Sequence, residues 1–593
     1  MSRFSQGLVA AARSTKGITT GVPTAPVRTR WAEIHETARR GAAVLSEAGV
    51  QSGSAVAILA GLPIDVAPAA QAYLAAVTPD EPAQAVWLAG RSVTMLHQPT
   101  ARTDLARYAA ETLAVLTMIG ARVVIVGEPF TSVAEMLSGS GFVTVTADSM
   151  RAGEASAEPV HASEDATALL QLTSGSTATP KAVQITHRNL WANISAMSQA
   201  AEIDPEREVM VSWLPLFHDM GMVGFLTLPM CRGIELVKAT PTDFLRSPLM
   251  WLELISSYRG TITAAPDFAY ALAARVLPRA EGLDLTSLRF ALDGAEPIDV
   301  SAARAFLAAG EPFGLRGTAV VPAYGMAEAT LGISFHQWGT PLAIDTVDAA
   351  ALEESDRAIP ITADDADRAA RGAEQSIEIG ATADLSGSEP APPANGALPG
   401  EAHPVRQFPL LGRPLPGIEV EVRTSDGTRC GDREVGTIML RGESITERYV
   451  TVDGPSPTRG ADGWLDTGDL GYLVDGVVVV CGRAKDVIIM GGRNIYPTDI
   501  ERVAQTVPGV RAGNVAAVRI DAGARRETFA VIVESRSADD EVENARITTE
   551  VRAAVTSRIG VRPSLVVVVP AGSLPKTPSG KIRRSAAAAL LPK

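Results

Sequence analysis

The chain has 593 residues and a mass of 62.0 kDa, and its length excludes a one-domain protein, because single compact cores stop growing at roughly 250–300 residues. Hydrophobic residues make up 46% and charged residues 20%, a globular composition with enough apolar surface for several cores. The formal net charge of -14 opposes non-specific attraction to phosphate backbones and anionic lipid, so we expect no nucleic-acid partner.

The cysteines and the N-terminal residues indicate the cellular compartment of the protein. Cys231, Cys430 and Cys481 stand far apart without metal-ligand spacing, so neither a disulfide framework nor a zinc site is indicated. Residues 1–17 lack a sustained apolar core, and no run of roughly 18 apolar residues occurs anywhere in the chain. We expect a soluble, cytoplasmic protein with no export signal and no integral membrane association.

The first half alternates between helical and strand patterns. Residues 31–50 place apolar side chains at helical spacing, and Gly49 ends this pattern before an apolar strand at 54–61. The alternation continues with a helix at 112–120, a strand at 121–129, and a strand followed by a helix at 261–277. Helices between short apolar strands are typical of parallel sheets covered on both faces, so the pattern predicts an α/β fold with doubly wound sheets.

The composition changes in the second half. Residues 341–404 are rich in Ala, Asp, Glu, Pro and Ser, and few of them could offset the entropy of ordering, so we expect a flexible insertion there. Segments at 418–424, 436–442 and 474–483 are separated by Gly or Asp-Gly turns and predict a β-barrel-like layer.

The last part of the chain mixes both patterns. It predicts helices at 500–507 and 547–559 and strands at 515–520, 528–535 and 564–570. This is a reasonable size for a separate small α+β domain. We therefore predict a large domain at 1–482 and a small, mobile C-terminal domain at 483–593.

The most informative segment is a hydroxyl-rich loop. An apolar strand at 169–172 runs into TSGSTATPKA at 173–182. Small residues let backbone N–H groups approach phosphate oxygens, hydroxyls add donors, and Lys181 supplies positive charge. For such a loop alone, an ordinary Ser/Thr-rich turn is the alternative interpretation, and the Walker pattern is absent.

This loop is the first of seven ordered motifs. The others are WLPLFHDMGM at 213–222, DGAEP at 293–297, YGMAEAT at 324–330, GWLDTGDLG at 463–471, GRAKDVIIMGGRNIYPTDIE at 482–501 and PKTPSGKIRR at 575–584. With these motifs, the chain from about residue 30 onward resembles the adenylate-forming superfamily of acyl-CoA synthetases, adenylation domains and luciferases. Within it, the chain is most similar to the fatty acyl-AMP ligases.

The resemblance implies an ATP site. Its phosphate contacts are Thr173, Ser174, Gly175, Ser176, Thr177, Lys181 and Thr330. The backbone of Gly294, Ala295 and Glu296 flanks adenine, and Tyr324 stacks near it, followed by Gly325, Met326 and Ala327. Asp469 accepts the ribose hydroxyls and Arg483 makes the second ribose contact, whereas Asp469 on its own would be interpreted as a turn residue.

The same resemblance implies the catalytic residues. His218 lies near the reacting carboxylate and adenylate, although a lone histidine there would more often be structural. Glu328 helps hold Mg²⁺, and Lys581 reaches across the domain interface to the carboxylate and α-phosphate; without the motifs, both side chains would be interpreted as solvated. Lys485 occupies the hinge position about which the small domain rotates.

The implied reaction uses ATP and Mg²⁺ to convert a fatty acid to its acyl-AMP and pyrophosphate. The acyl group then passes to a phosphopantetheine thiol of an acyl carrier protein, or of a carrier domain in a polyketide or peptide synthase. The segment between Thr330 and Gly412 and GRNIYPTDIE at 492–501 favour this acceptor over coenzyme A. A fatty acyl-CoA synthetase is the alternative, and small aromatic acids are alternative substrates.

Some positions depart from the family pattern. Ala178, Ala182 and Arg448 stand where the family usually has glycine, and Asp293 stands where it more often has Ser or Gly. A Cβ at Ala178 could narrow the approach to pyrophosphate, so a catalytically weak acyl- or nucleotide-binding protein is the competing class. Apolar residues beside the histidine motif line an acyl tunnel or belong to the core: Val223, Gly224, Phe225 and Leu228.

Overall fold

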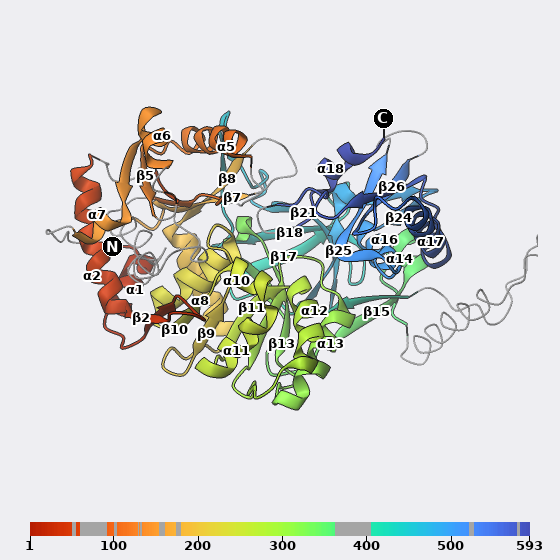
Figure 1. Cartoon of the computed structure of the whole chain (residues 1–593), viewed down its shortest axis with the longest axis horizontal. Helices are drawn as coiled ribbons and strands as arrows, with labels where there is room; N and C mark the ends of the chain where they lie inside the picture. Colours follow the sequence, from red (N-terminus) through yellow and green to blue (C-terminus); the bar gives the residue numbers. More distant parts are fainter. Residues whose placement is uncertain are drawn as a thin grey trace, which may run out of the picture.

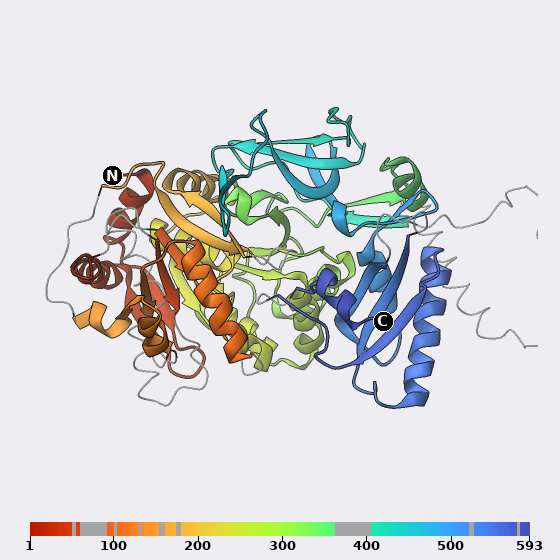
Figure 2. The same ribbon diagram turned by 90° about the horizontal axis from the view of Figure 1, so that it is seen from above.

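The structure, a computed structural model, has a large N-terminal body and a smaller C-terminal part, which Figures 1 and 2 both show gathered at one end of the molecule. The described residues are 1–49, 55–59, 92–99, 104–127, 130, 133–152, 161–173, 180–361, 405–520, 527–577 and 581–592. The predicted α/β fold is confirmed. The boundary between residues 482 and 483 stays a prediction.

The body contains two eight-stranded sheets. The first has the order β14-β13-β12-β11-β9-β10-β1-β2, with parallel inner strands and antiparallel edges at β2 and β14. Its strands are β1 (Gly17–Thr20), β2 (Val27–Arg30), β9 (Val209–Ser212), β10 (Glu235–Lys238), β11 (Ile262–Pro266), β12 (Phe290–Gly294), β13 (Val320–Gly325) and β14 (Gly332–Phe335). The predicted strand and helix at 261–277 are confirmed as β11 and α12.

The second sheet has the order β20-β19-β8-β7-β4-β3-β5-β6. Its strands are β3 (Ala55–Leu59), β4 (Ser92–Met95), β5 (Val123–Val126), β6 (Val143–Thr146), β7 (Thr167–Thr173), β8 (Lys181–Thr186), β19 (Arg448–Thr451) and β20 (Gly454–Pro457). The predicted strands at 54–61 and 121–129 correspond to β3 and β5. Because β19 and β20 come from much later in the chain, this sheet ties the two halves of the body together.

Helices cover these sheets (Figure 1). They are α1 (Arg3–Ala11), α2 (Trp31–Glu47), α5 (Leu105–Met118), α6 (Val133–Gly139), α7 (Ala147–Ala152), α8 (His187–Ala200), α9 (Leu228–Arg232), α10 (Pro241–Arg246), α11 (Pro248–Tyr258), α12 (Asp267–Val276) and α13 (Val300–Gly310). The predicted helix at 112–120 begins earlier, because the Asp104 side chain accepts hydrogen bonds from two backbone N–H groups of the first turn. Within the described ranges, no helix is long and apolar enough to cross a membrane.

The predicted β-rich layer is a four-stranded sheet of order β17-β18-β21-β22. Its strands are β17 (Ile418–Arg423), β18 (Gly436–Gly442), β21 (Leu465–Val474) and β22 (Val477–Arg483). Asp475 and Gly476 join the last two strands, and both have the positive φ that a tight hairpin turn requires.

The predicted flexible insertion needs a correction. Its first part contains β15 (Ile344–Asp348) and α14 (Ala349–Ser355), and β15 pairs with β16 (Val405–Pro409). The low hydrophobicity of residues 341–404 misled the prediction here, because strand pairing orders the segment that begins it. Residues 362–404 lie outside the described part of the chain.

The C-terminal part has a three-stranded sheet of order β25-β26-β27 with its own apolar core. Its elements are β23 (Ile488–Met490), β24 (Arg493–Ile495), α16 (Pro497–Ala504), β25 (Val510–Ile520), β26 (Thr528–Ser535), α17 (Glu541–Ile559), β27 (Leu565–Pro570) and α18 (Arg584–Ala587). The predicted elements are confirmed, with earlier starts for α16, β25 and α17. Ion pairs of Arg493 with Glu353 and of Arg406 with Asp499 join this part to the segment around β15 and β16.

The aromatic cluster under the first sheet should dominate the stability of the body. Trp251 is 1% exposed, its ring is 6.4 Å from that of Phe306, and its indole N–H donates to Thr263 at 2.9 Å. We predict that Trp251→Ala lowers the free energy of unfolding by about 3–5 kcal/mol, because a large cavity replaces the ring. Urea denaturation of the full chain measures this, with the exposed Val542→Ala as control; equal effects of the two changes would contradict the prediction.

Candidate active site

One cavity of about 2170 Å³ brings together residues from the body and from the C-terminal part. Gly294 ends β12 and Gly325 ends β13, so the cavity lies where parallel strands present their carboxyl ends. Lys581 lines the same cavity from the C-terminal side. The predicted residues that line it are His218, Lys181, Thr173, Gly294, Ala295, Glu296, Tyr324, Gly325, Met326, Ala327, Glu328, Asp469, Arg483, Lys485 and Lys581.

The phosphate loop is described only at its two ends. Thr173 ends β7 and Lys181 begins β8. Within the described part of the chain, the buried Thr173 hydroxyl has no hydrogen-bond partner. The predicted loop contacts Ser174, Gly175, Ser176 and Thr177 lie outside the described residues, as does Ala178.

Two other departures from the family pattern are placed by the structure. Ala182 is completely buried in β8, in an apolar cluster with Leu170 and Leu172. Arg448 is exposed in β19. Neither side chain lines the cavity wall, so these two replacements leave the described part of the site unobstructed.

Glu328 lies in a short 3-10 helix, Ala327–Ala329, after β13. Its Oε1 accepts a hydrogen bond from the Tyr449 hydroxyl at 2.8 Å and lies 3.7 Å from the Lys181 ammonium. Its side chain is mostly buried, so these contacts fix the carboxylate. The structure therefore brings together the predicted metal ligand and the predicted phosphate-binding lysine.

Thr330 is placed differently from the other predicted phosphate contacts. It is completely buried and has a φ of 73°, and its hydroxyl donates to the Ser444 carbonyl at 2.7 Å. Its side chain does not line the cavity, and its hydroxyl proton is used within the protein. Thr330 supports the turn that carries Glu328.

Asp469, Tyr324 and Arg483 form a compact polar cluster. The Tyr324 hydroxyl donates to Asp469 Oδ2 at 2.6 Å, and Arg483 Nε lies 2.7 Å from Asp469 Oδ1. Burial raises the pKa of Asp469, although the Arg483 charge and the Tyr324 hydrogen bond act in the opposite direction. The cluster is thus a preorganised acceptor next to a fixed cation.

The turn expected around Asp469 is a strand instead. Asp469 lies within β21 and pairs with Arg483 of β22. The pairing of β21 with β18 shifts register beside Gly468, whose φ is 68°. The Thr-Gly-Asp sequence was misinterpreted as a turn because a glycine-containing bulge and a turn share the same local sequence.

His218 and Asp219 form a second polar pair. His218 Nδ1 lies 2.6 Å from Asp219 Oδ1, and the Met220 N–H donates to the same oxygen at 2.7 Å. Burial would raise the pKa of Asp219, but His218, Lys581 and the Met220 N–H outweigh it, so the pKa is lowered. Asp219 also caps the helix that follows, because its side chain accepts from the Met220 N–H.

That helix begins as a π-helix, Met220–Thr227, and continues as α9. A Cβ at Gly221 would lie 2.1 Å from the Pro215 carbonyl oxygen, so only glycine fits at this close approach. Gly224, Phe225 and Leu228 line the cavity, whereas Val223 is core.

Lys581 faces several carboxylates of the body. Its positive charge lowers the pKa of Asp219 and opposes the effect of burial on Asp469 and Glu296. Burial still raises the pKa of Glu296, which accepts a hydrogen bond from the Phe268 N–H at 2.9 Å. The ammonium therefore lies among the predicted nucleotide and carboxylate contacts.

Lys485 lies in a 3-10 turn, Ala484–Asp486, directly after β22. Its carbonyl oxygen accepts a hydrogen bond from Arg519 Nη1 at 3.2 Å, and burial lowers the pKa of its ammonium. The residue thus stands between the four-stranded sheet and the C-terminal sheet. Its role as a hinge stays a prediction.

Three further residues near the site were not predicted from the sequence. Tyr449 contacts Glu328, and His97 lines the cavity, where burial and the His218 charge lower its pKa to about 4. Asp267 follows β11, which pairs with β12 in a register that brings it beside Asp293. In the sequence, Asp267 directly follows one apolar segment and Asp293 directly follows another. Two acidic residues in such positions were the signal that could have revealed Asp267.

Asp267 and Asp293 form a buried carboxyl pair. Asp293 is 0% exposed, and Asp267 accepts a hydrogen bond from the Asp299 N–H at 2.9 Å. Burial and mutual repulsion raise the pKa of Asp293 well above its usual range, and burial raises the pKa of Asp267 to about 7. Both carboxyl groups therefore favour their protonated forms more than an exposed aspartate does.

The Asp267 and Asp293 pair should make the stability of the folded protein depend on pH. Folding raises both pKa values, so the pair contributes its full stability at low pH and loses it as the pH rises through about 7. Asp293→Asn keeps the side-chain size and removes one of the two titratable groups. We expect the melting temperature of wild type to fall more than that of Asp293→Asn between about pH 6 and pH 8.5. Parallel pH profiles for the two proteins would be the contrary result.

Comparison with known proteins supports the resemblance. The AMP-binding enzyme family matches residues 11–356, and the AMP-binding enzyme C-terminal domain matches residues 492–586. The protein Rv1013 of Mycobacterium tuberculosis is 48% identical over 590 residues, covering 99% of both chains. The medium-chain fatty acid acyl-carrier-protein ligase JamA of Moorena producens is 34% identical over 71% of this chain and 67% of its own.

A solved structure agrees over the whole chain. It comes from a study of the fatty acyl-adenylate ligases of E. coli and L. pneumophila and has a TM-score of 0.82 at 28% identity, covering 99% of this chain and 97% of its own. The resemblance drawn from the ordered motifs is therefore confirmed. The chain belongs to the AMP-binding enzyme family and is an adenylate-forming enzyme.

Proposed function

We propose that this enzyme activates a fatty acid with ATP, releases pyrophosphate, and transfers the acyl group to the phosphopantetheine thiol of an acyl carrier protein. One observation carries the proposal: a single cavity joins the polar cluster around Asp469 and Glu328 to an apolar wall and to Lys581. A nucleotide suits the polar end and an alkyl chain suits the apolar end. Met197, Met210, Phe225, Leu228, Phe290 and Leu331 contribute to this wall.

The nucleotide would bind across the strand ends. Asp469, held by Tyr324 and Arg483, accepts the ribose hydroxyls, and the backbone of Gly294 and Ala295 flanks adenine. Glu296 accepts a hydrogen bond from the first turn of α12 and so fixes this segment. Lys181 and Thr173 serve the phosphates, together with the loop between them.

In the first half-reaction, a carboxylate oxygen of the fatty acid attacks the α-phosphorus of ATP. The new P–O bond forms as the bond to the pyrophosphate oxygen breaks. Lys581 offsets the charge that gathers on the phosphoryl oxygens, which is electrostatic catalysis by a positioned cation. His218, oriented by Asp219, lines the cavity where the carboxylate would lie.

The residues also fit Mg²⁺, which usually binds proteins through one or two carboxylates together with substrate phosphates. Glu328 supplies such a carboxylate, and the described residues contain no group of three side chains that would form a separate metal site. Glu328 would hold the ion next to Lys181. When bound, Mg²⁺ neutralises phosphate oxygens.

The identity of the acyl acceptor is the more specific part of the proposal. The printed name of JamA gives an acyl carrier protein as its acceptor, and the segment between Thr330 and Gly412 supports the same choice. Coenzyme A is the second candidate, because the insertion in that segment is unusually polar and partly low-complexity. Rotation of the C-terminal part about Lys485 would admit the thiol, and we expect the reaction in the cytoplasm.

The adenylation step is tested with Lys581→Ala. We expect ATP-pyrophosphate exchange with a panel of fatty acids to fall about 100- to 1000-fold, the loss typical of a preorganised electrostatic contact. Lys16→Ala is the matched control, because its ammonium donates to the Glu206 carbonyl away from the cavity. Exchange by wild type with no acid of the panel, despite ATP binding, would instead support the weak nucleotide-binding protein.

The acceptor is tested by product analysis. Purified enzyme is given ATP, a fatty acid and either coenzyme A or a phosphopantetheinylated carrier protein, and mass spectrometry identifies the thioester. We expect acyl-AMP to accumulate without carrier and acyl-carrier to form with it. Rapid formation of acyl-CoA with an unloaded carrier would move the enzyme to the acyl-CoA synthetases.

A further inference from the structure

Tyr449 contacts both charged side chains at the phosphate end of the cavity. It lies in β19, which pairs with β8 so that Tyr449 is opposite Val183 and Thr451 is opposite Lys181. Tyr449 and Lys181 are therefore diagonal neighbours on one face of an antiparallel pair, within reach of long side chains. The Lys181 ammonium lies 3.9 Å from the centroid of the Tyr449 ring.

The tyrosine hydroxyl meets the other charge. It donates to Oε1 of Glu328 at 2.8 Å, the same oxygen that lies 3.7 Å from the Lys181 ammonium. That second distance exceeds a normal N–H to oxygen hydrogen bond of about 2.7–3.2 Å. Tyr449 thus holds the ammonium on its ring face and the carboxylate at its hydroxyl, and the two charges stay just apart.

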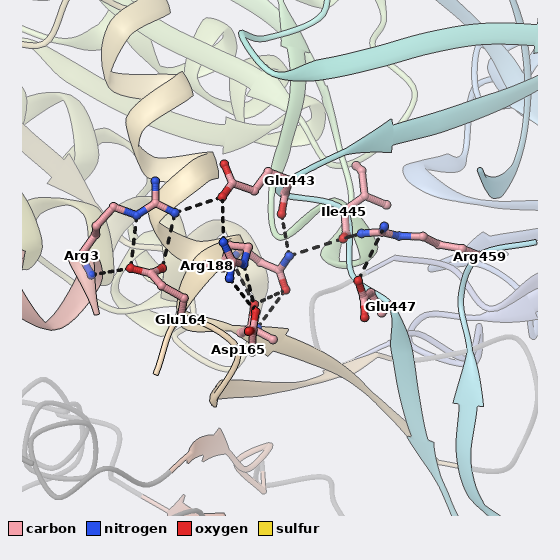
Figure 3. A network of polar contacts seen from close by, with 10 residues as sticks. Arg3, Glu164, Asp165, Arg188, Glu443, Ile445, Glu447 and Arg459 are labelled. Carbon is pink, nitrogen blue, oxygen red and sulfur yellow. Dashed lines mark hydrogen bonds and ion pairs between the residues drawn. The ribbon is translucent and has the colours of Figure 1, made fainter. Parts of the chain in front are cut away.

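The backbone around Tyr449 is held in place. The Thr446 N–H donates to the Glu328 carbonyl at 2.8 Å, so the loop before β19 and the turn of Glu328 are joined directly. On this loop, Asn189 donates to the Glu443 and Ile445 carbonyls, and Arg459, which Figure 3 shows beside Ile445, donates to the Ile445 carbonyl. A tyrosine that directly follows such a fixed loop can set the position of a neighbouring side chain.

A buried carboxylate requires donors, and an unpaired one takes the nearest cation. Glu328 is 9% exposed. Without the tyrosine hydroxyl, the closest replacement is the Lys181 ammonium, which needs to move only a short way. A tight pair of Lys181 with Glu328 would withdraw both groups from an incoming nucleotide and its cation.

We propose that Tyr449 is a positioning residue that keeps Glu328 and Lys181 apart and available, the first for the divalent cation and the second for the phosphates of ATP. The inference rests on the proposed function, since it assumes that this end of the cavity binds ATP with Mg²⁺. Tyr449 acts through Glu328 and does not contact the reacting atoms. Its loss should therefore weaken the cooperation between Mg²⁺ and ATP binding.

The test uses the full chain with Tyr449→Phe. Calorimetry measures ATP affinity without fatty acid, in the absence of Mg²⁺ and at saturating Mg²⁺, and the ratio of the two affinities is the coupling. We expect the coupling to fall about tenfold, as for the loss of one hydrogen bond to a charged group. The KM for Mg·ATP in pyrophosphate exchange should rise by a similar factor, while kcat at saturation changes little.

Two variants make the result specific. Tyr472→Phe is a matched control, because the buried Tyr472 hydroxyl donates to Asp345 at 2.8 Å, outside the cavity wall; its coupling should equal that of wild type. In a Glu328→Gln background, Tyr449→Phe should cause no further loss, because the residue acts through that carboxylate.

The proposal is overturned if Tyr449→Phe retains the wild-type coupling, or if its ATP affinity falls equally with and without Mg²⁺. An additive loss in the Glu328→Gln background would overturn it too. Failure of the proposed function is a separate outcome: wild type would show no pyrophosphate exchange with any acid. A reduced coupling in Tyr449→Phe would then still support the positioning role.

Discussion

The pairing of β8 with β19 is the constraint on which the active site depends. The two strands are far apart in the sequence, yet their register places Tyr449, Lys181 and Glu328 at one end of the cavity. The charged network in Figure 3 surrounds the loop that enters β19, where Glu443 lies between Arg3 and Arg188. Exposed ion pairs contribute little each, so the hydrogen bonds of Asn189 and Arg459 to the loop carbonyls stabilise the arrangement more.

The net charge of -14 on the whole chain opposes the binding of a polyanion, so the site needs positive charge of its own. Burial raises the pKa of Asp469 and Glu296, while Lys581 and Arg483 lie close enough to counter part of that effect. Lys581 and Arg483 therefore supply local positive charge inside the cavity, which the net charge of the chain does not reveal. Burial and mutual repulsion likewise raise the pKa values of Asp267 and Asp293, which favours their uncharged forms.

Much of this arrangement followed from sequence. The apolar periodicities predicted both kinds of element, and the ordered motifs predicted that Asp469, Glu328 and Lys581 would meet. Local sequence could not predict that Asp469 lies in a bulged strand, because a bulge glycine such as Gly468 also suits a turn. It could not predict the contact of Tyr449 with Glu328 either, because that contact depends on strand register between distant segments.

The predicted boundaries of some helices were wrong for similar physical reasons. Capping by Asp104 and Asp540 extends α5 and α17 beyond their apolar patterns. The segment at 344–355 folds although its composition resembles a flexible linker, because β16 supplies its hydrogen-bond partners. The composition of a segment indicates its average tendency to fold, whereas pairing with a neighbouring strand determines its structure.

Lys581 belongs to the C-terminal part, which has its own apolar core. All the residues of the site therefore lie together only when the body and the C-terminal part are arranged as they are in this structure. The rate of the chemical step then scales with the fraction of molecules that hold the arrangement. Contacts remote from the chemistry, such as Arg406 with Asp499 and Arg493 with Glu353, act on that fraction. Salt and temperature would thus tune turnover through docking equilibria as well as through the reacting groups.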